Sequence, residues 1–370
     1  MSVQIELLVG SAAFWDRARP EIEQARRRVL VQAMTFEGDS AGLAAARAVG
    51  GSQAADRRVL VDDYTRLMLS DRWVGAGEPP AHSAAEAAQT RAMFRDLQTA
   101  GAPVRVTNPV RPSMTNYPAR NHKKLLVTED VAWLGGLNFA DHNFAWDDLM
   151  VRLEGREVAD ALAMDFEATW NSRAAPWRLE LPSITLIGMD GRSNRRSMSE
   201  VDTLIAEARR EIVLVSPYAT RPFLDGLARA RRRGVNVRLI TPLANNKPLV
   251  RDAMLGFAVA ADFELVLIPR MSHLKGLSVD GETVVVGSAN FDIVSLEAEE
   301  ELLAIIRDPQ FAGAFQRQVI EPLTAKGLAV PPPRVSGLRL AAANAALSVA
   351  GLAARLASAW PRRAADFDWA

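Results

Sequence analysis

The chain has 370 residues, more than one hydrophobic core usually supports, so two domains or two fused lobes are expected. Lysine and arginine total 44, as do aspartate and glutamate, and the resulting zero net charge argues against a protein that holds nucleic acid by charge alone. Cysteine is absent, which excludes disulfides, a thiolate nucleophile and cysteine-based metal sites.

Neither a secretion signal nor a membrane span is expected. The first 22 residues carry Glu6 and Asp16 and lack the apolar centre of a signal peptide. No stretch reaches the roughly 18 to 20 apolar residues that a spanning helix needs. We therefore expect a protein that is either cytoplasmic or peripheral on the inner face of a membrane.

An internal repeat organises the chain. The segment IEQARRRVLV at 22–31 is similar to IAEARREIVL at 205–214, and in both a helix end rich in Glu and Arg leads into a β-branched strand. A helical stretch and a second strand follow each copy, at 57–63 and 235–242. This alternation predicts βαβ units and an α/β fold with a mostly parallel sheet in each half.

The repeat also sets the expected domain boundaries. We predict an N-terminal lobe at 1–175, with an insertion near 64–100 because the first half is longer between its landmarks. A second lobe follows at 176–330, and Pro331-Pro332-Pro333 begins a linker and an amphipathic helix that fill 331–370. That helix suits either a membrane interface or packing against the lobes, and both alternatives stay open.

The most informative repeat lies later in each half. RNHKKLLVTEDVAWLGGLNFAD at 120–141 matches MSHLKGLSVDGETVVVGSANFD at 271–292. Both copies hold His-x-Lys, a strand, an acidic turn, a second strand, a pair of small residues and Asn-Phe. The chain has only four histidines, and two of them open this repeat. The other two, His82 and His142, are expected to be solvated or locally hydrogen-bonded.

Each copy carries groups suited to phosphodiester chemistry. Residues two apart on a strand share a face, so each His and its Lys should point the same way. An imidazole can attack phosphorus, while an ammonium and an amide stabilise the phosphate oxygens. Two such sets around one phosphodiester would let the second imidazole protonate the leaving oxygen. The two sets are His122, Lys124 and Asn138, and His273, Lys275 and Asn290.

The pattern resembles the HxK(x)4D…G(G/S)xN signature of the phospholipase D superfamily over residues 1–325. The resemblance implies two pseudo-twofold-related α/β/α lobes, each with a mixed, mostly parallel sheet flanked by helices, and a mechanism without metal or cofactor. The first half departs from the signature, with Glu129 where the second half has Asp280. The resemblance also implies that Ser288 binds the substrate phosphate together with the motif lysines and asparagines. It further implies structural roles for Glu129, Asp280, Gly135, Gly136 and Gly287.

Within the superfamily, AWDDLMVRLEG at 145–155 and DFEATW at 165–170 look like bacterial cardiolipin synthases. In such enzymes a carboxylate downstream of each Asn orients the His of its own half. The resemblance assigns this role to Asp148 and Glu301, with Asp147 and Glu300 as near-neighbour alternatives. Val294 stands where an Arg is common in that family.

By the same resemblance His122 is the nucleophile that forms a phosphohistidine, and His273 is the general acid and base. The resulting hypothesis is a phospholipid phosphodiesterase or phosphatidyltransferase that works at a peripheral membrane surface. A monomer would suffice, because the duplication supplies both halves of the site. The alternatives are a nuclease of the same superfamily, which the zero net charge disfavours, and a non-catalytic protein that binds anionic lipid.

Overall fold

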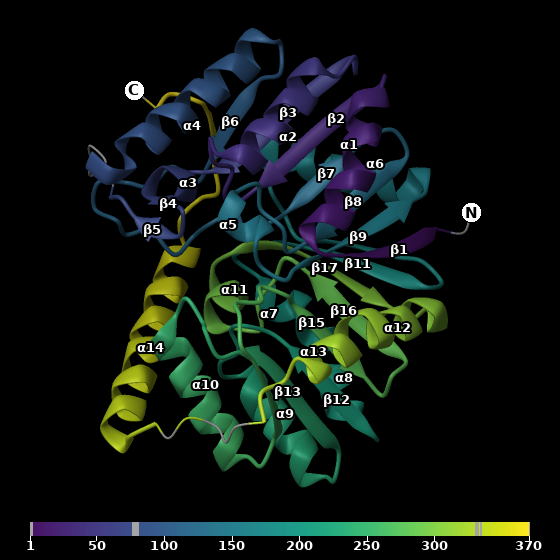
Figure 1. The fold of residues 1–370 in the computed structure, drawn as a ribbon, viewed down its shortest axis with the longest axis vertical. Coiled ribbons are helices and arrows are strands. Elements are labelled where there is room, and N and C mark those ends of the chain that lie inside the picture. Colours follow the sequence, from purple (N-terminus) through teal and green to yellow (C-terminus); the bar gives the residue numbers. More distant parts are fainter. Residues whose placement is uncertain (1–2, 76–80, 330–332, 334, 370) are drawn as a thin grey trace. The chain divides into compact units, whose positions relative to one another are not determined.

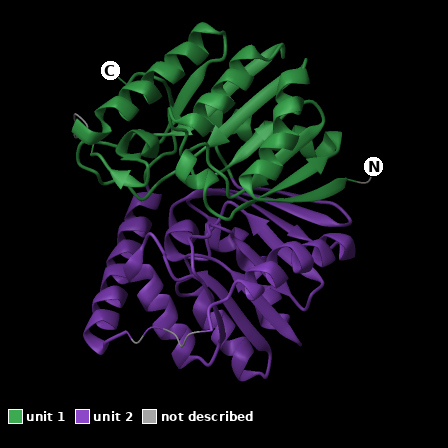
Figure 2. Cartoon of the chain, viewed as in Figure 1, with its two compact units in different colours: residues 1–175, 360–370 green, residues 176–359 purple. Residues whose placement is uncertain are grey.

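The computed structural model describes residues 3–75, 81–329, 333 and 335–369. The chain folds as two compact units (Figure 2): unit 1 comprises residues 1–175 and 360–370, and unit 2 comprises residues 176–359. Two prolines of the predicted boundary, Pro331 and Pro332, lie outside the described residues. Each unit is described below by itself.

Unit 1 is built on one eight-stranded sheet (Figure 1). Its strands, in spatial order, are β1 (Gln4–Val9), β9 (Leu149–Glu154), β8 (Val131–Gly135), β7 (Leu125–Val127), β2 (Arg28–Ala33), β3 (Asp56–Asp62), β6 (Val104–Thr107) and β18 (Ala364–Asp366). A separate two-stranded hairpin consists of β4 (Met68–Leu69) and β5 (Arg72–Trp73).

Helices cover both faces of this sheet. Phe14 of α1, Val49 of α2 and Phe94 of α4 share one buried cluster with alternate residues of β2 and β3, as expected for strands of period two. The buried Phe166 of α6 is not part of that cluster, and α6 contacts β2, β7, β8 and β9 on the opposite face. The helices are α1 (Ser11–Gln24), α2 (Ser40–Gly51), α3 (Tyr64–Leu67), α4 (Ala81–Thr99), α5 (Asp141–Phe144) and α6 (Arg156–Trp170).

Unit 2 repeats this plan. Its strands, in spatial order, are β10 (Trp177–Glu180), β11 (Ile184–Asp190), β17 (Glu300–Ile306), β16 (Thr283–Gly287), β15 (Gly276–Val279), β12 (Glu211–Val215), β13 (Asn236–Pro242) and β14 (Glu264–Ile268). Its helices are α7 (Asn194–Ser197), α8 (Ser199–Glu207), α9 (Phe223–Arg232), α10 (Pro248–Ala260), α11 (Ile293–Glu297), α12 (Pro309–Phe315), the π-helix η1 (Gln316–Ile320), α13 (Glu321–Ala325) and α14 (Gly337–Ser358).

The predicted fold class is confirmed, since both units are mixed α/β sheets flanked by helices. Parallel pairing is found in β2–β3–β6 and in β12–β13–β14, where helices connect the strands. The strands that follow the His-x-Lys segments, β7 with β8 and β15 with β16, pair in antiparallel fashion through short turns. The repeat seen in the sequence is therefore a repeat of topology as well.

The extra length of the first half falls in two places. Between β3 and β6 unit 1 places α3, the β4–β5 hairpin and α4, where unit 2 has only α10 between β13 and β14. The connection from β6 to β7, residues 108–124, is also longer than its counterpart at 269–275. The second extension leads directly into the first His-x-Lys segment.

The C-terminal residues contribute to both units. Helix α14 belongs to unit 2, and the residues after it return to unit 1, where β18 pairs with the edge strand β6. Phe367 and Trp369 then pack against Phe94, with ring centroids 5.3 and 5.5 Å apart. The tail thus closes one edge of the unit 1 sheet.

The expectation that no segment could span a membrane is wrong by length and composition. Helix α14 has 22 residues and is apolar enough to cross a bilayer, and only 22% of its most apolar window is buried. Its many alanines, with leucines between them, give a long apolar helix that lacks the bulky run which marks most spanning segments. Because α14 packs on α10 and α11, we treat it as part of unit 2.

Candidate active site

Both His-x-Lys segments occupy the same place in their sheets. His122 and Lys124 lie in the extended residues just before β7, and His273 and Lys275 lie just before β15. The residue that precedes each histidine forms an isolated bridge. The histidines therefore stand at the ends of strands rather than within them, although the shared side of His and Lys is kept.

The lysines make the same contact in both units. Nζ of Lys124 donates to the carbonyl oxygen of His122 at 2.6 Å, and Nζ of Lys275 donates to that of His273 at 2.7 Å. Nζ of Lys275 also lies 2.9 Å from both ring nitrogens of His273. Because an ammonium has no acceptor, the ring nitrogen that it bonds must be unprotonated. A lysine so placed carries its charge next to the imidazole.

The glycines of the motif are required by close packing. A Cβ on Gly135 would overlap the carbonyl oxygen of Leu149 on β9, and one on Gly287 would overlap that of Leu302 on β17. Each glycine thus lets β8 or β16 approach the strand that carries the downstream carboxylate. This contact accounts for the structural role predicted for both positions.

The residue after each of these glycines differs between the units: it is Gly136 in unit 1 and Ser288 in unit 2. The carboxylate beside it differs too, as the next contacts show. A Cβ on Gly136 would overlap the carboxylate of Asp148. In unit 2 the hydroxyl of Ser288 instead donates to the longer Glu301, and it accepts from the N–H of Leu302 at 2.9 Å. Unit 1 therefore pairs a glycine with an aspartate that lies against it, whereas unit 2 pairs a serine with a glutamate that accepts its hydrogen bond.

Exchanging one of these residues alone should be costly. Gly136→Ser should lower the free energy of unfolding by about 1–3 kcal/mol, because the new side chain must displace the buried Asp148 carboxylate. Ser288→Gly, the matched change in unit 2, causes no overlap but removes a hydrogen-bond donor from the buried Glu301 carboxylate and should also cost about 1–3 kcal/mol. Urea unfolding of both variants measures the two losses, and equal stability of Gly136→Ser and the wild type would contradict the packing argument.

The two asparagines follow β8 and β16 at matching positions. Oδ1 of Asn138 accepts from the N–H of Thr35 at 3.2 Å, which leaves its NH₂ group as the donor end. Oδ1 of Asn290 is buried and has no hydrogen-bond partner among the described residues. A buried amide oxygen without a partner is uncommon and often marks a functional position.

The two acidic motif positions bind backbone rather than substrate-facing groups. Oε1 of Glu129 accepts from the N–H groups of Arg26 and Arg27, and Asp280 accepts from those of Arg209 and Arg210. Partial burial opposes ionisation of Asp280, but these N–H groups hold its pKa below the usual value. Glutamate in unit 1 thus makes the same link to the start of β2 that aspartate makes to the start of β12.

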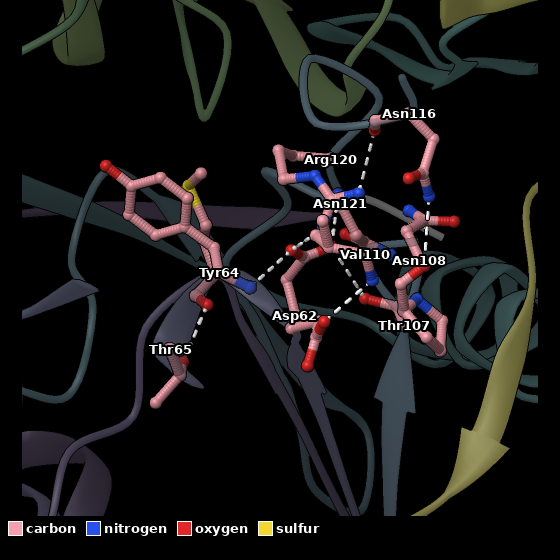
Figure 3. A network of polar contacts seen from close by, with 12 residues as sticks. Asp62, Tyr64, Thr65, Thr107, Asn108, Val110, Asn116, Arg120 and Asn121 are labelled. Carbon is pink, nitrogen blue, oxygen red and sulfur yellow. Dashed lines mark hydrogen bonds and ion pairs between the residues drawn. The ribbon is translucent and has the colours of Figure 1, made fainter. Parts of the chain in front are cut away.

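A buried polar network supports the residues just before His122 (Figure 3). Asp62, at the end of β3, accepts from Nη1 of Arg120 at 2.9 Å and from the N–H of Asn121 at 2.8 Å. Thr107 of β6 donates to the same carboxylate at 3.0 Å. Burial raises the pKa of Asp62, and the Arg120 guanidinium and the backbone N–H groups oppose that shift. The network fixes the backbone that enters the His-x-Lys segment.

The middle residue of the first motif is anchored on the other side of the segment. Nζ of Lys123 lies 2.7 and 2.8 Å from the two carboxylate oxygens of Asp165 on α6, and both side chains are almost fully buried. Unit 2 has Leu274 at this position, also buried. Lys123 and Leu274 therefore hold their neighbouring histidines to the opposite face by different means.

Unit 2 places further polar groups near His273 that the sequence did not single out. The ring of Tyr218 meets the His273 ring edge to face, with centroids 6.2 Å apart, and Nζ of Lys247 lies 4.3 Å from the Tyr218 ring centre. Tyr218 follows the apolar strand IVLVSP and Lys247 sits in a loop, so neither belongs to a repeated motif. The contact with His273 makes Tyr218 a candidate for substrate contact, and the contact with Tyr218 makes Lys247 another.

A cluster of carboxylates lies beside Glu301 in unit 2. Oγ of Ser295 is 2.9 Å from Glu299 and 2.8 Å from Glu301. One hydroxyl has one proton to donate, so one of these carboxyls must itself be protonated for both contacts to be hydrogen bonds. Burial, with the charges of Glu301 and Asp292, raises the pKa of Glu299 to about 8. Glu299 is therefore the neutral partner at pH 7, and unit 1 has Trp146 in its place.

This assignment predicts a pH-dependent stability. The folded protein keeps a proton on Glu299 between about pH 4.5 and 8 that the unfolded chain releases, so stability falls as pH rises through that window. Glu299→Gln keeps a neutral side chain and removes this loss. The free energy of unfolding of the variant minus that of the wild type should therefore be at least about 1 kcal/mol larger at pH 8 than at pH 5. Urea unfolding at both values tests this, and an identical difference at the two would contradict it.

Comparison with known proteins identifies the family. The family model described as "Cardiolipin synthase, PLD-like domain" matches residues 19–170 and 201–321, well over half of the chain. The chain therefore belongs to this family of phospholipase D-like proteins. Both matched segments contain a complete His, Lys and Asn set, as the resemblance of the motifs indicated.

Curated relatives agree with this family. Cardiolipin synthase B of Escherichia coli K12 is 27% identical over 340 residues, covering 83% of this chain and 77% of its own length. Minor cardiolipin synthase ClsB of Bacillus subtilis 168 is 28% identical over 254 residues, covering 62% of this chain and 63% of its own. The solved phosphatidylserine synthase of Haemophilus influenzae Rd KW20 aligns with a TM-score of 0.71 over 95% of both chains; at 16% identity this shows the fold alone.

Proposed function

We propose that this protein is a phosphatidyltransferase, cardiolipin synthase-like, that moves a phosphatidyl group between alcohols and acts as a phospholipase D when water is the acceptor. The observation that carries the proposal is the duplicated set of His, Lys and Asn, placed at the same strand ends in both units. The relatives named above as cardiolipin synthases support a phospholipid as the substrate.

The proposed reaction has two steps at one site formed by both sets. A ring nitrogen of His122 attacks the phosphorus, and the bond from phosphorus to the leaving alcohol breaks as His273 donates a proton to that oxygen. His273 then takes the proton of the acceptor alcohol, whose oxygen attacks phosphorus and breaks the bond to His122. Lys124, Lys275 and the two asparagines would stabilise the phosphate oxygens in both steps.

Positioning groups complete the proposal. Asp148 and Glu301, each buried next to the motif of its own unit, are proposed to fix the tautomers of the two histidines. Ser288 donates its one proton to Glu301, so it would bind the phosphate only by turning that hydroxyl from the carboxylate to a phosphate oxygen. All of this chemistry uses side chains, so EDTA should leave the activity unchanged.

The substrate is tested by comparing two diesters. Purified protein should convert phosphatidylglycerol in vesicles to cardiolipin and glycerol, or to phosphatidic acid and glycerol when water is the acceptor. Single-stranded DNA under the same conditions should stay intact. Cleavage of DNA without turnover of phospholipid would reject the proposal and favour a nuclease, and binding of vesicles without turnover of either would favour a lipid-binding protein.

A further inference from the structure

A pocket of unit 2 is lined by none of the motif residues. It has a volume of about 820 Å³ and is bounded by α10 and α14, with the start of α9 and the residue that begins α11 at its inner end. Figure 1 shows α14 running beside α10. A volume of this size falls within the roughly 300–1,000 Å³ of typical ligand pockets.

Helix α14 is fastened at both ends and leaves the pocket between them. Near its start, Gly256 lets α10 approach Leu340, and Arg339 pairs with Asp252. Near its end, Gly351 packs against Ile293, and Arg355 pairs with Glu297. These contacts fix α14 against α10 near its start and against α11 near its end.

The lining is that of a site for an alkyl chain. The residues contributed by the two helices to the pocket are mostly apolar or small, and few polar side chains interrupt them. Leu352 both lines the pocket and is 60% exposed, so the apolar surface continues from the pocket to the outside of α14. The helix residues that line it include Ala253, Phe257, Ala260, Leu340, Leu347 and Leu352.

The outer face of α14 extends this apolar surface. Val349 is 68% exposed and Leu356 is 66% exposed, and their spacing from Leu352 places all three on one face of the helix. Such a continuous apolar face on a soluble unit indicates an interaction surface. A water-soluble ligand in the pocket would leave this apolar face exposed to water, whereas a bilayer in contact with α14 would cover the face.

The charges around the pocket select the kind of lipid. Helix α14 carries two arginines and no acidic residue. Arg195 and Arg355 share the single carboxylate of Glu297. Arg221 also lines the pocket; its side chain is 72% exposed and pairs with Asp225 at 3.4 Å, so three guanidinium groups face two carboxylates. An excess of guanidinium groups at the edge of an apolar slot suits a phosphate head group.

We infer that the slot between α10 and α14 takes one acyl chain of an anionic phospholipid while the exposed face of α14 lies on the bilayer. This site is separate from the His, Lys and Asn sets and concerns attachment to the membrane rather than the reaction. It deepens the proposed function only in that both require a phospholipid.

Photo-crosslinking on vesicles tests the inference without turnover. Wild-type protein is mixed with vesicles of phosphatidylglycerol and phosphatidylcholine that contain phosphatidylglycerol with a diazirine at the end of one acyl chain. After irradiation, the labelled peptides should come from residues 248–260 and 337–358. Ser348→Trp, which fills the pocket from an exposed lining position, should reduce this label at least fivefold, whereas Ala345→Trp on the same helix but outside the lining should keep it.

Four outcomes would overturn the inference. Label confined to other segments, or equal label in Ser348→Trp and the wild type, would show that the slot does not hold the chain. Equal label from a diazirine phosphatidylcholine in vesicles without anionic lipid would remove the role of the arginines. Absence of lipid label from a protein that sediments as a dimer would mean that a second copy covers the groove. Turnover is scored separately, so an inactive protein that labels as expected would reject the proposed reaction alone.

Discussion

Replacing either His122 or His273 by alanine should lower the turnover of phosphatidylglycerol by about 10⁴-fold or more. Each variant removes one of two groups that act in the same two steps, so the double variant should be no slower than the slower single variant. The measurement is product formation on vesicles, together with circular dichroism to show that the fold is kept.

The control is His82→Ala, because His82 is exposed on α4 and far in sequence from both motifs. It should keep nearly full activity. If His122→Ala or His273→Ala retained more than about a tenth of the wild-type rate, the proposed two-histidine mechanism would be rejected.

Lys123→Leu should destabilise unit 1 by about 3–5 kcal/mol, because it leaves the carboxylate of Asp165 buried without its cation. The change copies the side chain that unit 2 uses at the same position, Leu274. Urea unfolding measures the loss, and the adjoining His122 should also lose its fixed orientation, so turnover should fall.

The double variant Lys123→Leu with Asp165→Leu separates charge from packing. Replacing both partners of a buried ion pair by apolar groups is often neutral, so the double variant should return to within about 1 kcal/mol of the wild type. If Lys123→Leu alone were as stable as the wild type, the ion pair would not anchor the segment. If the double variant were as unstable as the single one, the loss of stability would come from the packing of the lysine side chain rather than from its charge.

The parts of the fold that the sequence predicts are those where both halves obey the same pattern. Strand and helix periodicity, with Ala-Arg-Arg before β2 in one half and before β12 in the other, predicts the two sheets. The resemblance of the motif assigns structural roles to Glu129 and Asp280, and in the structure both accept from N–H groups of the repeated arginine pair. Local rules and tertiary structure agree at these positions.

The remaining features depend on contacts that no local pattern encodes. Residues 364–366 become a strand only because β6 offers an unpaired edge, so the return of the tail to unit 1 has no signal in the short sequence AAD. Glu299 lies in an acidic run that is typical of a solvated loop. That it is protonated can be inferred only from the position of Ser295 between Glu299 and Glu301. The sequence predicts helix α14 as an amphipathic helix, but not as one long and apolar enough to span a bilayer, because alanine dominates it.

The central claim is that both histidines serve one phosphorus atom, and a trapped intermediate tests it most directly. Protein mixed with phosphatidylglycerol and quenched in alkali, where phosphohistidine survives, should carry at most one phosphatidyl group per chain by intact mass. Peptide mapping should place that group on His122, with no adduct in His122→Ala. Two groups on one chain, or an adduct that persists in both single histidine variants, would show that the histidines do not share a phosphate.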